Sequence, residues 1–104
     1  MDKKMNTIID FEFCDGTTAK MTLTFYALYQ LKAKNKALYE RYNKIMTKNT
    51  SEELELITVL YTAYVCANLS EENLLTEEEF MMLCGSDRIA VRDAVQELTQ
   101  PKKH

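Results

Sequence analysis

The sequence has a single histidine, His104, at the last of its 104 positions. A histidine on a terminal tail cannot act as the general base of a formed active site, and no second one is present for a cysteine–histidine pair or a triad. No glycine-rich phosphate loop occurs, and Cys14, Cys66 and Cys84 lack metal-ligand spacing. We therefore expect no enzymatic activity, no catalytic or metal-binding residues and no cofactor.

Glycine and proline are also scarce, with two and one respectively, which disfavours long loops and linkers. We expect residues 1–104 to form a single domain. The odd number of cysteines and their apolar surroundings predict free, mostly buried thiols in a reducing compartment. No signal-peptide core is found near the start, and the apolar stretch 54–69 is too short and too polar to span a bilayer. These features predict a cytoplasmic protein without a membrane partner.

Residues 7–23 have the pattern of an amphipathic β-hairpin. Apolar and polar residues alternate on both sides of an Asp15-Gly16 turn signal. A two-residue loop would mix the two faces, whereas a three-residue loop, 14–16, keeps the apolar residues together and places Gly16 where a left-handed backbone is needed. The predicted pairs are Phe11 with Ala19, Ile9 with Met21 and Asp10 with Lys20.

The rest of the chain has helical periodicity. We expect helices at about 25–47, 51–69, 77–84 and 88–99, and a tail at 100–104. Asn35 either is tolerated within the first helix or begins a second one. Capping boxes are expected at Thr50–Glu53 and Thr76–Glu79, and Gly85 should end its helix.

The helix at 51–69 is apolar on most sides, Leu54 included, so we expect it at the centre of the core. In the last helix, Ile89, Val91, Val95 and Leu98 are available for burial. The predicted fold class is α+β and mostly α: an N-terminal antiparallel β-hairpin packed on a bundle of four to five helices.

Charge is unevenly distributed along the chain. Six basic residues stand between positions 32 and 48 against one acidic residue, Glu40, and the chain downstream is net negative. Such a layout can pair within one molecule or head to tail between copies. Tyrosines interleave with these lysines, and exposed tyrosines favour protein contacts. The predicted protein-binding residues are Tyr26, Tyr29, Lys32, Lys36 and Tyr39.

A nucleic-acid-binding function is the main alternative. Residues 80–95 resemble a helix-turn-helix, with Arg88 and Arg92 at the start of its second helix. However, Asp87, Asp93 and Glu97 offset these arginines. Two helices packed at an angle account for the same pattern, so we expect a protein partner instead.

The order of elements resembles a known protein family. A short strand pair leads into F-x-A-L-x-x-L (Phe25, Ala27, Leu28, Leu31), and a helical remainder contains TEEEF-x-x-L (residues 76–83). Over about residues 7–99 this resembles the small tail assembly chaperones of long-tailed phages and of prophages in Gram-positive bacteria.

This resemblance implies a non-enzymatic chaperone in the cytoplasm of the bacterial host. Such a chaperone would hold the tape measure protein during phage tail morphogenesis, pass it to the tail tube protein, and be absent from the finished virion. It would also self-associate. A small nucleic-acid-binding regulator and a structural subunit of the virion remain the alternative functions.

Overall fold

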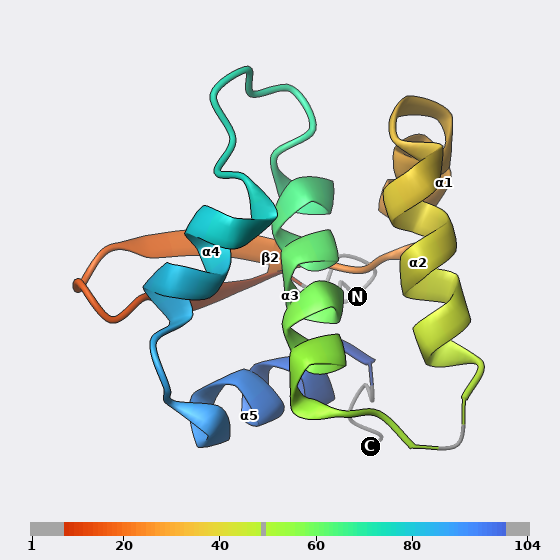
Figure 1. The fold of residues 1–104 in the computed structure, drawn as a ribbon. Coiled ribbons are helices and arrows are strands. Elements are labelled where there is room, and N and C mark those ends of the chain that lie inside the picture. Colours follow the sequence, from red (N-terminus) through yellow and green to blue (C-terminus); the bar gives the residue numbers. More distant parts are fainter. Residues whose placement is uncertain (1–7, 49, 100–104) are drawn as a thin grey trace, which may run out of the picture.

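The computed structural model describes residues 8–48 and 50–99, which form a two-stranded antiparallel hairpin and five helices (Figure 1). The predicted class, α+β and mostly α with an N-terminal hairpin, is confirmed. The elements are β1 (Ile8–Glu12), β2 (Thr18–Thr22), α1 (Phe25–Lys34), α2 (Lys36–Met46), α3 (Glu53–Ala67), α4 (Glu77–Cys84) and α5 (Arg88–Thr99).

The hairpin has the predicted register. Phe11 pairs with Ala19, Ile9 with Met21 and Asp10 with Lys20. The Phe13 N–H donates to the Thr17 carbonyl at 2.7 Å, which closes the three-residue loop, and Gly16 has a φ of +90°. A one-residue slip would turn the buried side of the hairpin to solvent, so burial of its apolar face selects this register.

The hairpin turn also contacts the end of α4. The Cys14 N–H donates to the Leu83 carbonyl at 2.8 Å. Gly85, at φ +63°, ends α4 as predicted, and a Cβ at that position would lie 3.3 Å from the Cβ of Cys14. A glycine is therefore favoured at this point both by its backbone conformation and by the close approach of the turn.

Asn35 separates α1 from α2, which decides the question that the sequence left open. Its N–H donates to the Leu31 carbonyl at 2.6 Å, and its side-chain oxygen accepts from the Leu38 N–H at 3.2 Å. One asparagine thus ends the first helix and caps the second. The two helices lie side by side in Figure 1.

Helix α3 lies at the centre, with the hairpin, α2, α4 and α5 around it (Figure 1). Val59, Leu60, Thr62 and Ala63 are almost fully buried. The prediction of a central helix is confirmed, but not for its first turn, because Leu54 is 65% exposed. Leu54 precedes the part of α3 that the other elements surround.

The start of α3 differs from the prediction. The helix begins at Glu53, and Glu52 is its N-cap, so the expected capping box of Thr50 and Glu53 is wrong. The Glu53 carboxylate instead accepts a hydrogen bond from the Arg88 Nε–H at 2.8 Å. The Glu55 carboxylate accepts from the Glu52 N–H at 3.0 Å, so the capping role moves two residues along the chain.

Helices α4 and α5 have the predicted bounds. The Thr76–Glu79 capping box is present, and Asp87 caps α5 by accepting from the Ala90 N–H at 3.0 Å. Val91, Val95 and Leu98 are buried, but Ile89 is 69% exposed, so its predicted burial is wrong. Ile89 lies in the first turn of α5, on a different side from Val91.

Of the cysteines, Cys66 and Cys84 are buried, Cys14 is exposed, and all three are free. Within the described ranges no helix is both long and apolar enough to cross a membrane. Thr7, the predicted tail at 100–104 and its His104 lie outside the described residues.

Candidate protein-binding surface

Helix α1 has one face in the core and the other in solvent. The Thr24 hydroxyl caps the helix by accepting from the Ala27 N–H at 3.2 Å. Ala27 and Leu31 are buried, whereas Phe25, Tyr26 and Tyr29 are exposed by 92%, 68% and 72%. Three large aromatic side chains therefore stand in water on one short helix, an arrangement that is typical of contact surfaces.

The predicted binding residues form two neighbouring groups. The Tyr26 and Tyr29 rings stack with centroids 6.2 Å apart and planes 24° apart. The Lys32 ammonium lies 5.5 Å from the centroid of the half-buried Tyr39 ring, which is a cation–π contact between α1 and α2. Lys36, at the start of α2, lies 3.9 Å from the carboxylate of Glu40.

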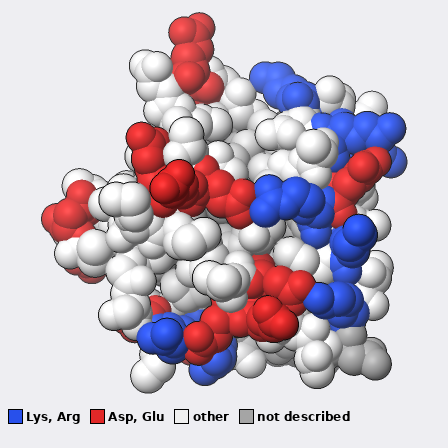
Figure 2. All heavy atoms as spheres, in the orientation of Figure 1, with Lys and Arg blue, Asp and Glu red and all other residues white. Residues whose placement is uncertain are grey.

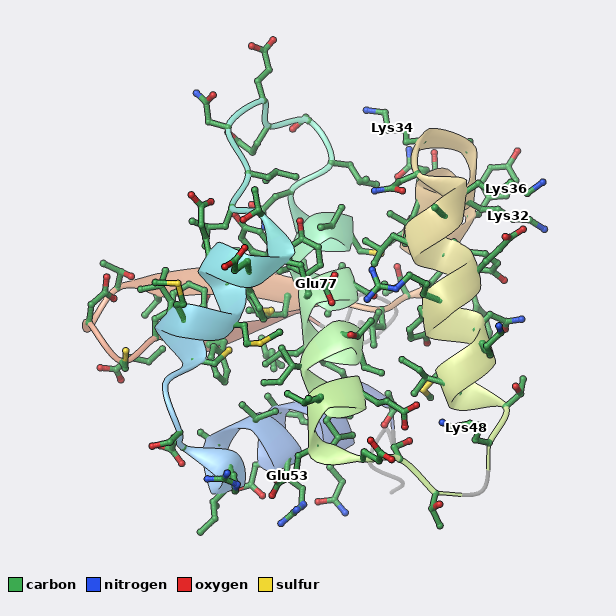
Figure 3. All side chains as sticks on the ribbon, in the orientation of Figure 1. Lys32, Lys34, Lys36, Lys48, Glu53 and Glu77 are labelled. Atoms are coloured by element: carbon green, nitrogen blue, oxygen red, sulfur yellow. The ribbon has the colours of Figure 1, made fainter. Side chains whose placement is uncertain are left out.

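Lysines cluster where α1 meets α2. Figure 3 shows Lys32 and Lys36 pointing outward in the same direction, and the Lys34 ammonium donates to the Leu69 carbonyl at 3.1 Å. In Figure 2 basic side chains gather over α1 and α2, and carboxylates gather over α4 and the segment before it. The basic and acidic residues that are separated along the sequence therefore also lie on different parts of this face.

Part of the predicted basic face is used inside the molecule. Arg41 forms a two-point ion pair with Glu77, at 2.9 and 3.0 Å, and Lys48 pairs with Glu55. The Arg41 hydrogen bond lowers the pKa of Glu77, and the Lys48 hydrogen bond lowers the pKa of Glu55. The basic side chains left for a partner at the α1–α2 junction are mainly those of Lys32 and Lys36, whereas Lys44 lies in the last turn of α2.

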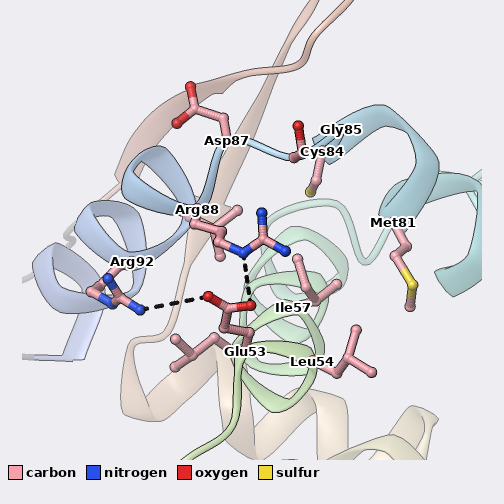
Figure 4. Close-up of a pocket in the computed structure, with 12 residues that line it drawn as sticks. Glu53, Leu54, Ile57, Met81, Cys84, Gly85, Asp87, Arg88 and Arg92 are labelled. Atoms are coloured by element: carbon pink, nitrogen blue, oxygen red, sulfur yellow. Dashed lines mark hydrogen bonds and ion pairs between the residues drawn. The ribbon is translucent and has the colours of Figure 1, made fainter.

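The arginines of the helix-turn-helix alternative are also engaged. Arg88 and Arg92 project from the same side of α5 toward Glu53, at 2.8 and 4.0 Å (Figure 4). This arrangement reduces the positive charge that α5 offers to phosphates.

Sequence reasoning missed two features of the surface. Phe25 is three residues before the half-buried Leu28, so its spacing gave no sign of exposure. The other is a groove between α3, α4 and α5, lined by Leu54, Ile57 and Met81. The sequence signal that could have indicated this surface is the adjacent pair Met81-Met82, because methionine side chains adapt to varied apolar partners.

The described residues contain no cluster of three or more histidine, cysteine or acidic side chains that could hold a metal ion. Comparisons of this chain with protein-family models, curated proteins and solved structures yield no match. The function is therefore inferred from the surface and from the sequence resemblance.

Proposed function

We propose that this protein is a non-enzymatic chaperone that holds an α-helical client in phage tail assembly, the tape measure protein, before the tube polymerises around it. The observation that carries this proposal is the exposure of Phe25, Tyr26 and Tyr29 on α1, the helix that has Lys32 and Lys34 in its last turn. Long client helices with unpaired apolar stripes need such a cover, and aromatic side chains supply large contact areas with few rotatable bonds.

The basic residues next to the aromatic ones define the kind of client. Lysines beside an apolar contact favour a client helix whose stripe is flanked by acidic residues. The proposed contact residues are Tyr26, Tyr29, Lys32, Lys36 and Tyr39, with Phe25 added because of its exposure. Self-association and transfer of the client to tail tube protein belong to the same proposal.

The test is co-expression with a candidate tape measure protein, a long helical protein encoded beside this one, read by co-purification and light scattering. We expect a soluble complex, with the client insoluble when it is expressed alone. An unaffected client would contradict the chaperone function. Detection of the protein in purified particles would favour the structural subunit, and salt-dependent DNA or RNA binding would favour the regulator.

A double substitution tests the surface itself. Tyr29→Ala with Lys36→Ala should weaken client binding and leave the fold intact, since both side chains are exposed. The matched control is Lys44→Ala with Met46→Ala, which removes one lysine and one exposed apolar side chain from the other end of α2. Equal binding by both variants and the wild type would rule out this surface.

A further inference from the structure

The groove between α3, α4 and α5 is an apolar site at the other end of α3 from the α1–α2 junction (Figures 1 and 4). Leu54 and Ile57 of α3 and Met81 of α4 project into it, and α5 forms the remaining wall. Leu54 is 65% exposed and Met81 37%. Two large apolar side chains are therefore left at one opening, where a partner could cover them.

The size of the groove limits what it can take. It encloses about 130 Å³, which is close to the ~150 Å³ apolar cavity that admits a benzene ring. Small-molecule sites usually begin at about 300 Å³. The groove therefore suits one leucine-, methionine- or phenylalanine-sized side chain, as when a helix places an anchor residue in a pocket.

The charged wall indicates what should flank that side chain. Arg88 and Arg92 share the single carboxylate of Glu53, and Arg92 is only at the limit of ion pairing, at 4.0 Å. Asp87 also lines the groove, but its carboxylate caps α5 and points away from Arg88 and Arg92 in Figure 4. The three side chains at this wall, Glu53, Arg88 and Arg92, thus carry one net positive charge.

We propose that this groove binds one apolar side chain of an α-helix of a different protein, that this helix has a carboxylate one helical turn away, and that Arg92 pairs with this carboxylate. The most exposed aromatic residues of a second copy do not meet this description, because α1 has lysines and no acidic residue. Helix α4 of a second copy, with Glu78 and Met82, could meet it. Dimerisation is therefore an outcome that the test must detect.

The probes are two labelled amphipathic peptides of about 20 residues, long enough to form a helix. Both have a leucine stripe, flanked by glutamates in one peptide and by lysines in the other. Both are measured on the Tyr29→Ala Lys36→Ala protein, because the α1 surface is proposed to favour the same glutamate-flanked helix. This protein should bind the glutamate peptide at least about tenfold more tightly than the lysine peptide, by fluorescence anisotropy. Leu54→Glu should abolish this binding, and Ile89→Glu, an exposed position outside the groove, should not.

Substitutions of the charged residues test whether the groove prefers acidic residues beside the bound apolar side chain. Arg92→Glu should remove the preference for the glutamate peptide. Glu53→Gln should tighten glutamate-peptide binding, because it releases both guanidinium groups from their shared carboxylate. If Arg92 and Glu53 had only a structural role, Arg92→Glu and Glu53→Gln would not change the affinity for the glutamate peptide in opposite directions.

Three results would overturn the proposal: no saturable binding of either peptide, equal binding of both, or binding that survives Leu54→Glu. Dimerisation of the wild type that Leu54→Glu abolishes would also overturn it and assign the groove to a second copy. Measurement in the Tyr29→Ala Lys36→Ala background keeps this test separate from the α1 surface, so binding that Leu54→Glu then abolishes belongs to the groove. Failure of the client experiment would likewise leave this groove in place.

Discussion

Arg41 in α2 and Glu77 in the first turn of α4 are 36 residues apart in the sequence and are joined by two hydrogen bonds, of 2.9 and 3.0 Å. The Thr58 hydroxyl of α3 also donates to the Glu77 carboxylate, at 2.9 Å. Three helices therefore meet at one carboxylate. Thr58 is buried and the Glu77 side chain is 24% exposed, so water replaces these bonds poorly.

Glu77→Ala should lower the free energy of unfolding by about 1–2 kcal/mol, because the buried Thr58 hydroxyl loses its acceptor and Arg41 loses its partner. Urea denaturation at neutral pH measures this difference. Glu78→Ala is the matched control, since it removes an exposed carboxylate from the next position of the same helix. Its effect should stay within about 0.5 kcal/mol, and equal losses for both variants would show that the Arg41–Glu77 pair contributes nothing.

The stability contributed by Glu77 should depend on pH. Arg41 holds the pKa of the folded Glu77 carboxyl below its ordinary value of 4.5. The contribution is therefore complete above the unfolded pKa and is lost as the pH falls through the folded pKa. The difference in unfolding free energy between the wild type and Glu77→Gln should be constant near neutral pH and shrink below about pH 4.5. A difference that grows on acidification would contradict the sign of this shift.

Two phenylalanines offer a direct comparison of core and surface. Phe80 is fully buried, and the centroid of its ring lies 5.4–5.5 Å from the ring centroids of Phe13, Tyr61 and Tyr64. Phe80→Ala should cost about 3–5 kcal/mol, and Phe80→Leu should cost less. Phe25→Ala, at a position 92% exposed, should change stability by at most about 0.5 kcal/mol. A comparable loss at Phe25 would show that this side chain is not free for a partner.

The thiols should differ sharply in reactivity. Burial raises the pKa of Cys66 to about 12 and that of Cys84 to about 11, whereas Cys14 is exposed. Because the thiolate is the reactive form, an aromatic disulfide reagent at pH 8 should modify Cys14 rapidly and the other two only after denaturation. The Cys14→Ser variant should lose the fast phase, and a fast phase that persists would contradict this assignment.

The sequence was most informative where local rules act alone. Period-two alternation and the conformation of Gly16 were enough to predict the strand register, since any other register exposes the apolar face. The limits of α4 could also be predicted, because they depend on contacts within a few residues: the helix begins at the capping box of Thr76 and Glu79 and ends at Gly85. The helical pattern of α1 likewise predicted that Tyr26 and Tyr29 are exposed, and their binding of a partner stays a prediction.

Prediction failed where a side chain has a choice between local and distant partners. Glu53 has the right spacing for a capping box with Thr50, but it bonds Arg88 of α5. The basic run at 32–48 could pair within one molecule or between copies, and only the structure shows that Arg41 pairs with Glu77 of the same chain. Neither partner lies within reach along the chain, so no local rule could select it.

The hairpin register, the amphipathic faces and the limits of α4 and α5 could be predicted from the sequence alone, because hydrophobic periodicity, caps and glycine conformation act over a few residues. The tertiary structure decided which apolar side chains stay in water. Phe25, Leu54 and Ile89 have the spacing of buried residues and yet are exposed. Each lies in the first turn of its helix, where packing of distant elements, and not helical period, determines whether the side chain is covered.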